Sequence, residues 1–188
     1  MDTKVYVLGC ENFKHLFQEF GFRFEKHWGG KYYPLISNTP LDKWSDGVLY
    51  YLHKIADEYI ILLSEDFYMV KDTDLKAVER LVKIAKEKKA DRVSLMGNHS
   101  PHRTVNVGED LWKYLPNMPY QLSFEASIYR TSFLTEHMRM GENPWQSETN
   151  RNAEQLNGNV YCSTKPVIWY GDKIRRGMIQ EEVICPYL

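Results

Sequence analysis

The residues of this chain with the clearest potential for chemistry are two adjacent carboxylates, Glu65 and Asp66, that follow an apolar run over residues 58–63. Such a run is typical of a central parallel strand buried on both faces. Ligands of open α/β sheets bind outside the carboxyl ends of the strands, so the pair stands where a site is expected. Carboxylate oxygens suit Mg²⁺ or Mn²⁺, which complete their shells with waters and substrate phosphates. The spacing leaves a second interpretation open, in which the pair belongs to a solvated turn or caps a following helix.

Two further groups of side chains carry charge or ring nitrogens. Lys173, Arg175 and Arg176 form a basic cluster near the C-terminus, which would complement a metal in holding a diphosphate, and which a solvated tail explains equally well. His99 and His102 have H-x-x-H spacing, which is weak as a metal motif without further ligands. We interpret these histidines as residues of a loop that could close over phosphate or acceptor.

The first half of the chain alternates between strand and helix patterns. Periods of two and of 3.6 residues predict strands and helices respectively. The predicted strands are 5–8, 32–36, 58–63 and 91–96, and the predicted helices are 11–27, 43–56 and 72–89. This order predicts a three-layer α/β/α domain with an open, Rossmann-like, mostly parallel mixed sheet.

The second half is less regular, and it predicts fewer elements. Residues 99–119 are rich in polar residues, Pro and Gly and are expected to form a long loop. A strand is expected over 120–129, helices over 131–138 and 144–156, and a strand over 160–170 that is interrupted at Pro166. Because no repeat, low-complexity tract or interdomain linker is visible, we expect one domain over 1–188.

Composition narrows the function classes. The 188 residues are 43% hydrophobic and 26% charged, as in ordinary globular proteins, and the net charge of −1 shows no footprint of a long polyanion. Three scattered cysteines do not form a disulfide framework or a zinc motif, which favours a reducing compartment. Without a signal-peptide pattern or a long apolar run, we expect a cytoplasmic protein, in the host cytoplasm if viral, with no integral membrane association.

Four blocks in the same order resemble a bacterial and viral group of GT-A glycosyltransferases. The group has a Trp-Ser helix before a strand that ends in Asp-Asp-x-Phe, and later blocks near Ser-Leu-Gln-Ala-Ala-Ile-Trp-Arg, Glu-x-Pro-Trp-x-x-Glu and Ile-x-x-Gly-Lys. The matching segments here are 44–68, 122–134, 141–148 and 174–177. The sequence departs from the pattern at Glu65, where the group has Asp.

The resemblance implies a set of donor and metal contacts. Glu65 and Asp66 would bind Mn²⁺ or Mg²⁺, with Asp66 as the direct ligand. The implied donor-binding residues are Leu8, Gly9, Cys10, Trp44, Ser45, Ser64, Arg175 and Arg176. A plain strand-to-helix turn explains residues 8–10 nearly as well. Residues 1–97 would form the nucleotide-sugar-binding half and 98–188 the acceptor-binding half.

An inverting transferase needs a carboxylate within hydrogen-bond reach of the acceptor hydroxyl. Glu142 and Glu148 are the candidates for this base, although Glu148 could be a surface helix residue and Glu142 a helix N-terminal charge. Trp145 could stack on a sugar face. The expected acceptor-binding residues are Trp145, Glu125, His99 and His102.

The predicted function is transfer of a hexose or amino-hexose from a nucleotide-diphosphate sugar, a UDP-sugar first, to an acceptor hydroxyl. The acceptor could be a saccharide or a hydroxymethylated base in phage DNA, for which a local basic stripe over 83–89, or Arg175 with Arg176, would bind phosphates. One alternative is a sugar nucleotidyltransferase, although residues 8–11 offer no Gly-rich phosphate loop. Another is a non-catalytic domain that binds nucleotide sugars or carbohydrate.

Overall fold

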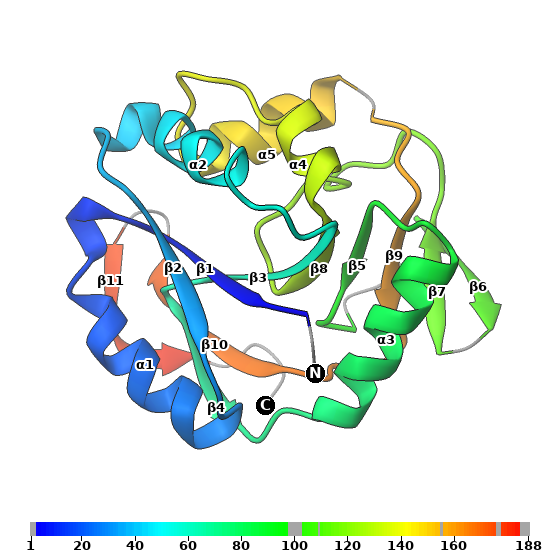
Figure 1. Cartoon of the computed structure of the whole chain (residues 1–188), viewed down its shortest axis with the longest axis horizontal. Coiled ribbons are helices and arrows are strands. Elements are labelled where there is room, and N and C mark those ends of the chain that lie inside the picture. Colours follow the sequence, from blue (N-terminus) through cyan, green and yellow to red (C-terminus); the bar gives the residue numbers. More distant parts are fainter. Residues whose placement is uncertain (1–2, 98–102, 109, 155, 176–177, 185–188) are drawn as a thin grey trace.

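The computed structural model describes residues 3–97, 103–108, 110–154, 156–175 and 178–184. Within them, eight strands form one large sheet with five α-helices around it (Figure 1). Across the sheet the strands are β2 (Tyr32–Ser37), β1 (Val5–Cys10), β3 (Tyr59–Ser64), β8 (Ser127–Arg130), β5 (Arg92–Ser94), β9 (Val160–Ser163), β7 (Leu111–Tyr114) and β6 (Thr104–Gly108). The helices are α1 (Leu16–His27), α2 (Trp44–Leu52), α3 (Leu75–Glu87), α4 (Thr131–His137) and α5 (Pro144–Ala153).

The large sheet is mixed but mostly parallel, as predicted. β2, β1 and β3 are parallel neighbours, and β8 runs antiparallel between β3 and β5. β9 is parallel to β5, whereas β7 is antiparallel to β9 and to β6. Only β8 and β7 therefore oppose the common strand direction. The carboxyl ends of β1 and β3 lie side by side, because Leu8 is in register with Ser64.

Alternation of side chains along the central strands builds a core on each face of the sheet. Val7 and Ile61 pack with buried residues of α1 and α3 on one face. Leu8 and Leu62 pack with α2 and α4 on the other face. Figure 1 shows α2, α4 and α5 together on that second side, with α1 and α3 on the opposite side. The single three-layer α/β/α domain predicted from the sequence is confirmed.

The strand and helix alternation of the first half is confirmed with shifted boundaries. The helix expected from residue 11 begins with a 3-10 turn over Glu11–Phe13, and α1 starts only at Leu16. The helix expected over 43–56 ends at Leu52. The helix expected from residue 72 starts at Leu75, because Asp74 caps it and accepts a hydrogen bond from the backbone N–H of Ala77 at 3.0 Å.

A second, three-stranded sheet was not anticipated. It pairs β11 (Met178–Ile184), β10 (Trp169–Arg175) and β4 (Phe67–Lys71) in antiparallel order. The single strand expected over 160–170 is therefore wrong. The chain leaves the large sheet after β9 and enters the small sheet at β10, and Pro166 lies in the connection between them.

Two other expectations for the second half are wrong in part. β6 and β7 pair as antiparallel strands where a loop was expected, and Gly108, which pairs with Leu111, and Asp110 both have positive φ angles. The region expected as a strand over 120–129 is a strand only from Ser127 onward. Residues 98–102 lie outside the described residues.

Gly47 of α2 makes a close approach to β2, which predicts a stability effect. A methyl group there would lie 2.9 Å from Cα of Ser37, so β2 or α2 would have to move. We expect Gly47→Ala to destabilise the fold by about 1–2 kcal/mol net, because an overpacking cost of about 2–3 kcal/mol exceeds the gain of about 1 kcal/mol in helix propensity. Urea unfolding measures the difference, with Gly21→Ala of α1 as the control. A Gly47→Ala protein as stable as the parent would contradict this packing.

Candidate active site

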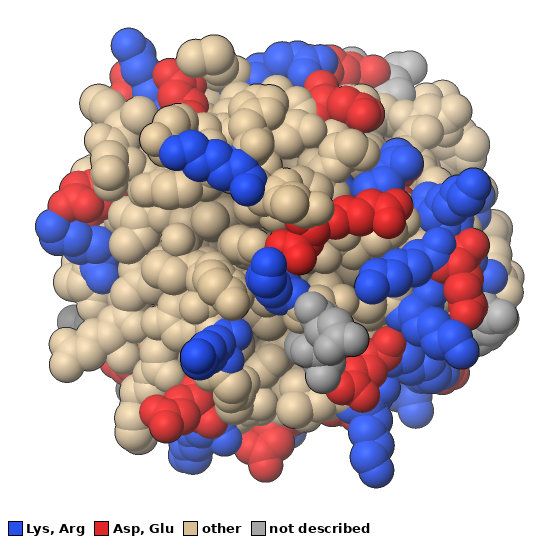
Figure 2. Space-filling model, viewed as in Figure 1, with Lys and Arg blue, Asp and Glu red and all other residues tan. Residues whose placement is uncertain are grey.

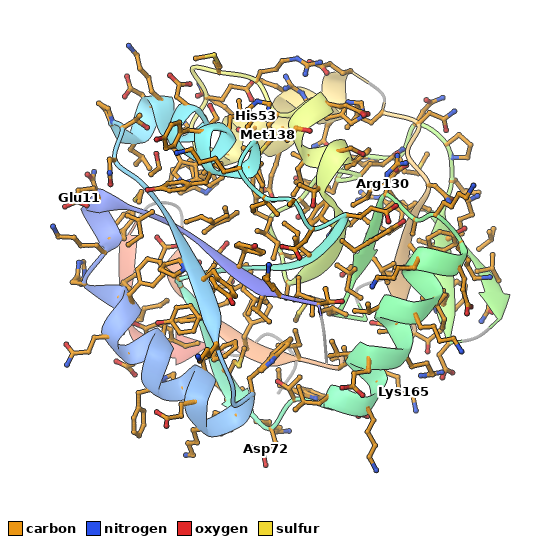
Figure 3. All side chains as sticks on the ribbon, viewed as in Figure 1. Glu11, His53, Asp72, Arg130, Met138 and Lys165 are labelled. Atoms are coloured by element: carbon orange, nitrogen blue, oxygen red, sulfur yellow. The ribbon has the colours of Figure 1, made fainter. Side chains whose placement is uncertain are left out.

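A pocket of about 310 Å³ opens at the carboxyl ends of β1 and β3. Figure 3 labels Glu11, which follows β1 and marks this end of the sheet. The lining residues predicted in the first half of the chain are Leu8, Cys10, Trp44, Ser64, Glu65 and Asp66. Those predicted in the second half are Glu125, Trp145 and Glu148. The fold thus brings most of the candidate residues into one cavity.

The acidic pair lies where β3 turns into β4. The backbone N–H of Glu65 donates to the carbonyl of Leu8 at 2.9 Å, which fixes the turn to the end of β1. The Glu65 carboxylate is 7% exposed and accepts a hydrogen bond from the backbone N–H of Cys10 at 3.3 Å. Burial, together with the neighbouring charge of Asp66, raises the pKa of Glu65 to about 8.

These two carboxylates fit a cation that arrives with a phosphate. No Lys or Arg side chain described in the structure forms an ion pair with Glu65, so its charge lacks compensation from the protein. The described residues hold no cluster of three or more His, Cys, Asp or Glu with metal-binding geometry. Mg²⁺ and Mn²⁺ need only one or two carboxylates when a substrate supplies phosphate oxygens. Glu65 and Asp66 are such a donor set.

The end of β1 forms the wall beside the acidic pair. Leu8 and Cys10 line the pocket, and burial followed by the charge of Glu65 raises the pKa of the Cys10 thiol. Gly9 does not line it. A Cβ at Gly9 would meet the ring of Phe17 at 2.5 Å, so the glycine makes room for packing of α1 and not for a ligand.

Trp44 and Ser45 begin α2, and only Trp44 lines the pocket. Trp44 lines the pocket and packs edge-on against Phe124, with ring centroids 5.0 Å apart. Ser45 is fully buried away from it, and its hydroxyl accepts from the backbone N–H of Glu142 at 2.9 Å. Ser64 lines the pocket, and its hydroxyl donates to the carbonyl of Phe124 at 3.4 Å. Ser45 is therefore placed to support the site and not to touch a donor.

The first turns of α5 bring Trp145 and Glu148 to the pocket. Asn143 and Gln146 form a capping box at the helix start, and Pro144 occupies the first turn. Trp145 lines the pocket and remains 41% exposed. This arrangement suits stacking against a sugar ring.

Two hydrogen bonds to Oε1 hold the carboxylate of Glu148. The hydroxyl of Ser123 donates to this oxygen at 2.9 Å, and the backbone N–H of Phe124 donates to it at 2.6 Å. Burial in the pocket raises the pKa of Glu148 above its usual range. A carboxylate with a raised pKa, fixed in a pocket, has the properties of a general base.

Glu142, the other candidate base, does not line the pocket. Its Oε1 accepts from Arg151 at 3.1 Å and from Asn150 at 2.8 Å. Both Glu142 and Arg151 are buried, and Arg151 also donates to the carbonyl of His137 at 2.9 Å. The geometry gives Glu142 a structural role in joining α5 to the end of α4.

Glu125 lines the pocket from the irregular segment before β8. Its carboxylate forms an ion pair with Arg92, whose side chain is fully buried. Sequence pattern does not single out Arg92, because a basic residue at the start of a short strand is usually exposed. This arginine is the most prominent functional candidate that sequence reasoning missed.

The structure does not describe the side chains of the remaining predicted residues. His99, His102 and Arg176 lie outside the described residues. Arg175 ends β10, and only its backbone is described. Asp172, which was not predicted, lines the pocket because β10 pairs with β4 and brings it opposite Phe67.

The described charged side chains that line the pocket are all acidic. They are Glu65, Asp66, Glu125, Glu148 and Asp172. The basic stripe proposed for DNA begins on α3, none of whose residues lines the pocket. In Figure 2, Lys and Arg side chains gather on the side of the molecule where Figure 1 places α3. Phosphate binding inside the pocket would therefore need a positive charge that these lining side chains do not supply.

No helix among the described residues is long and apolar enough to cross a membrane. No protein-family model matches the chain, and no curated protein matches it in sequence.

Solved structures share the fold at low sequence identity. TarS 1–349 of S. aureus in complex with UDP aligns with a TM-score of 0.57 and 14% identity, over 89% of this chain and 60% of that chain. The same protein in complex with UDP-GlcNAc gives 0.52 and 15%, over 94% and 60%.

The CMP:2-keto-3-deoxy-manno-octonic acid synthetase complexed with CTP aligns with a TM-score of 0.51 and 14% identity, over 92% of this chain and 93% of that chain. The chain spans about 60% of the length of the TarS structures. At these identities the likeness concerns the fold alone. Over most of its length the chain has the GT-A-like, Rossmann-like α/β fold of these nucleotide-bound structures.

Proposed function

We propose that this chain is a metal-dependent glycosyltransferase that moves a sugar from a nucleoside-diphosphate sugar to an acceptor hydroxyl. The observation that carries the proposal is the single pocket that joins the acidic pair Glu65-Asp66 to Trp145 and Glu148 of α5. A diphosphate needs the first group, and a sugar hydroxyl that must lose its proton needs the second. The TarS structures with UDP and UDP-GlcNAc support a UDP-sugar as the first donor to test.

The proposed reaction is a single displacement. Glu148 accepts the proton of the acceptor hydroxyl, and the oxygen forms a bond to the anomeric carbon of the donor sugar. The bond from that carbon to the β-phosphate oxygen breaks, and its electron pair leaves with the nucleoside diphosphate. Ser123 and Phe124 hold the Glu148 carboxylate in place while this happens, through their two hydrogen bonds to Oε1.

Glu65 and Asp66 would hold the cation, with Asp66 as the more accessible of the two carboxylates. A bound Mn²⁺ or Mg²⁺ supplies charge stabilisation for the leaving diphosphate. The acidic lining explains why the cation is needed: without it, the described carboxylates would repel the donor's phosphates.

The proposed acceptor is a saccharide. Trp145 gives a face for a sugar ring, and Glu125 and Glu148 give oxygens that accept hydrogen bonds from hydroxyl groups. A hydroxymethylated base would bring the phosphates of DNA against the same carboxylates, and the basic stripe on α3 lies outside the pocket. The acidic lining therefore disfavours the DNA acceptor.

The proposal is tested with UDP-GlcNAc as the donor probe and release of UDP as the readout. We expect slow release with Mn²⁺ or Mg²⁺, loss of release in EDTA, and faster release when a neutral saccharide acceptor is present. Duplex DNA with hydroxymethylated cytosine is the comparison acceptor. Failure to bind UDP and to release it under any metal condition would refute the proposal.

A sugar nucleotidyltransferase is the second candidate, because the CTP-bound synthetase shares the fold over nearly the full length of both chains. Such an enzyme would release pyrophosphate from a nucleoside triphosphate when a sugar is supplied. The chain after β1 enters a 3-10 turn at Glu11–Phe13 with no Gly-rich loop, which favours the transferase. Pyrophosphate release without UDP release from UDP-GlcNAc would reverse this choice, and UDP binding without either reaction would indicate a non-catalytic binding domain.

A further inference from the structure

Arg92 begins β5 in the middle of the large sheet, yet it carries a permanent charge with a side chain that is fully buried. Register places it opposite Tyr129 of β8, and its guanidinium lies 5.8 Å from the centre of the Tyr129 ring. A buried cation is costly unless hydrogen bonds and an opposite charge compensate it. The contacts of this arginine therefore show what its burial accomplishes.

The side chain of Arg92 makes polar contacts with three residues of the segment 120–127. Its Nε donates to the hydroxyl of Ser127 at 3.0 Å, and its Nη1 donates to the carbonyl of Tyr120 at 2.7 Å. Its Nη2 forms the ion pair with Glu125. Residues 120–126 belong to no helix or strand. The N–H of Leu95 donates to the carbonyl of Ala126 at 2.9 Å, and the N–H of Gly158 donates to Oε1 of Gln121 at 2.6 Å. The contacts of Arg92 add to these in fixing the segment.

A second series of contacts connects the same segment to Glu148. The hydroxyl of Tyr129 donates to the carbonyl of Ser123 at 2.5 Å and accepts from the Ser123 N–H at 3.1 Å. The Ser123 hydroxyl in turn donates to Oε1 of Glu148. The segment is thus fixed at Arg92 and Tyr129, and it holds the carboxylate that faces the acceptor.

We propose that Arg92 is the positioning residue for the acceptor side of the pocket: it fixes Glu125 and the segment 120–127, and with Tyr129 and Ser123 it sets the placement of the Glu148 carboxylate. The part of this inference that treats Glu148 as the base rests on the proposed function. Arg92 itself does not line the pocket.

The charges that face Glu148 give a readout that needs neither donor nor acceptor. Arg92 of β5 lowers the pKa of Glu148 and Glu125 of the segment raises it, whereas burial is the largest influence and the N–H of Phe124 and hydroxyl of Ser123 act against it. Removing Arg92 and removing the charge of Glu125 should therefore move the titration of Glu148 in opposite directions.

The test compares Arg92→Met, Arg92→Lys and Glu125→Gln. Carboxyl ¹³C NMR of Glu-labelled protein, assigned with Glu148→Gln, follows the titration of Glu148 without any donor or acceptor. We expect the midpoint to move to higher pH in Arg92→Met, to lower pH in Glu125→Gln, and to stay near the parent value in Arg92→Lys, which keeps the charge.

Kinetics then test the positioning role. In Arg92→Lys we expect kcat for UDP release from UDP-GlcNAc to fall by up to about 100-fold, the size of effect that a small misplacement produces, with the Kd for UDP unchanged. Tyr129→Phe removes only a hydroxyl and should lower kcat in the same way, so it serves if Arg92→Met does not fold.

Unchanged Glu148 midpoints in Glu125→Gln and in a folded Arg92→Met, or an unchanged kcat in both Arg92→Lys and Tyr129→Phe, would overturn the inference. A parent protein that neither binds UDP nor releases it from UDP-GlcNAc would refute the proposed function instead. The NMR midpoints would still decide whether Arg92 and Glu125 control Glu148.

Discussion

Replacing Glu148 by Gln is expected to lower kcat for sugar transfer by about 100- to 10,000-fold, the usual contribution of a positioned general base. Gln keeps the shape of the side chain and accepts hydrogen bonds from Ser123 and Phe124, but it cannot take the proton of the acceptor hydroxyl. The Kd for UDP should be unchanged, because the diphosphate would bind at the strand ends and Glu148 belongs to α5. Steady-state kinetics with UDP-GlcNAc at saturation measure the effect.

A matched control for this variant is Glu87→Gln on α3. Glu87 is exposed, and its carboxylate lies 3.8 Å from Nζ of Lys83. Because an exposed pair of this kind contributes little, the same chemical change there should leave kcat unaltered. Full activity in Glu148→Gln would show that the base lies elsewhere, and Glu125 would be the next residue to test.

Glu142→Gln is expected to have the opposite profile, with a large cost in stability and little change in kcat. The substitution removes the charge that pairs with buried Arg151. Breaking a buried ion pair costs about 3–5 kcal/mol, and we expect roughly 2–3 kcal/mol here because Glu154 still pairs with Arg151 at 2.7 Å. Urea unfolding of the purified variant measures the loss.

Activity per folded molecule separates the two glutamates. Below the unfolding transition, Glu142→Gln should retain nearly the parent kcat, since Glu142 does not line the pocket. A stable Glu142→Gln protein with abolished transfer would mean that Glu142, and not Glu148, is the base.

Most of the first half of the fold could be predicted from local pattern, because the period of each element is visible in its own residues. The exception is β4, which pairs with the distant strand β10. The strand β3 can be predicted from its own apolar residues, and its end places Glu65 and Asp66 at the edge of the sheet. The small sheet could not be foreseen in the same way. Asp172 reaches the pocket only because β10 pairs with β4, and these strands are about a hundred residues apart in the chain.

The site residues of the second half show the same limit. Position in the sequence does not show which of Glu142 and Glu148 faces the pocket. The capping box shows only that Glu142 precedes α5. Its burial against Arg151 depends on how α5 packs. Similarly, a strand pattern at 91–96 gives no sign that Arg92 will be buried, because its partners come from the irregular segment 120–127. Sequence pattern indicates which residues could do chemistry, whereas packing decides which of them face the pocket.

The central claim, that Glu65 and Asp66 hold a cation and a nucleoside diphosphate in this pocket, is tested most directly by thermal unfolding with UDP in the presence of Mn²⁺ or EDTA. Ligand at about a hundredfold above its Kd stabilises the native state by about 2.7 kcal/mol. We expect UDP to raise Tm with Mn²⁺ and not with EDTA, and we expect Asp66→Asn to lose the shift while Asp72→Asn, an exposed residue outside the pocket, keeps it. A shift with UDP that is the same in EDTA, or that survives in Asp66→Asn, would contradict the proposed site.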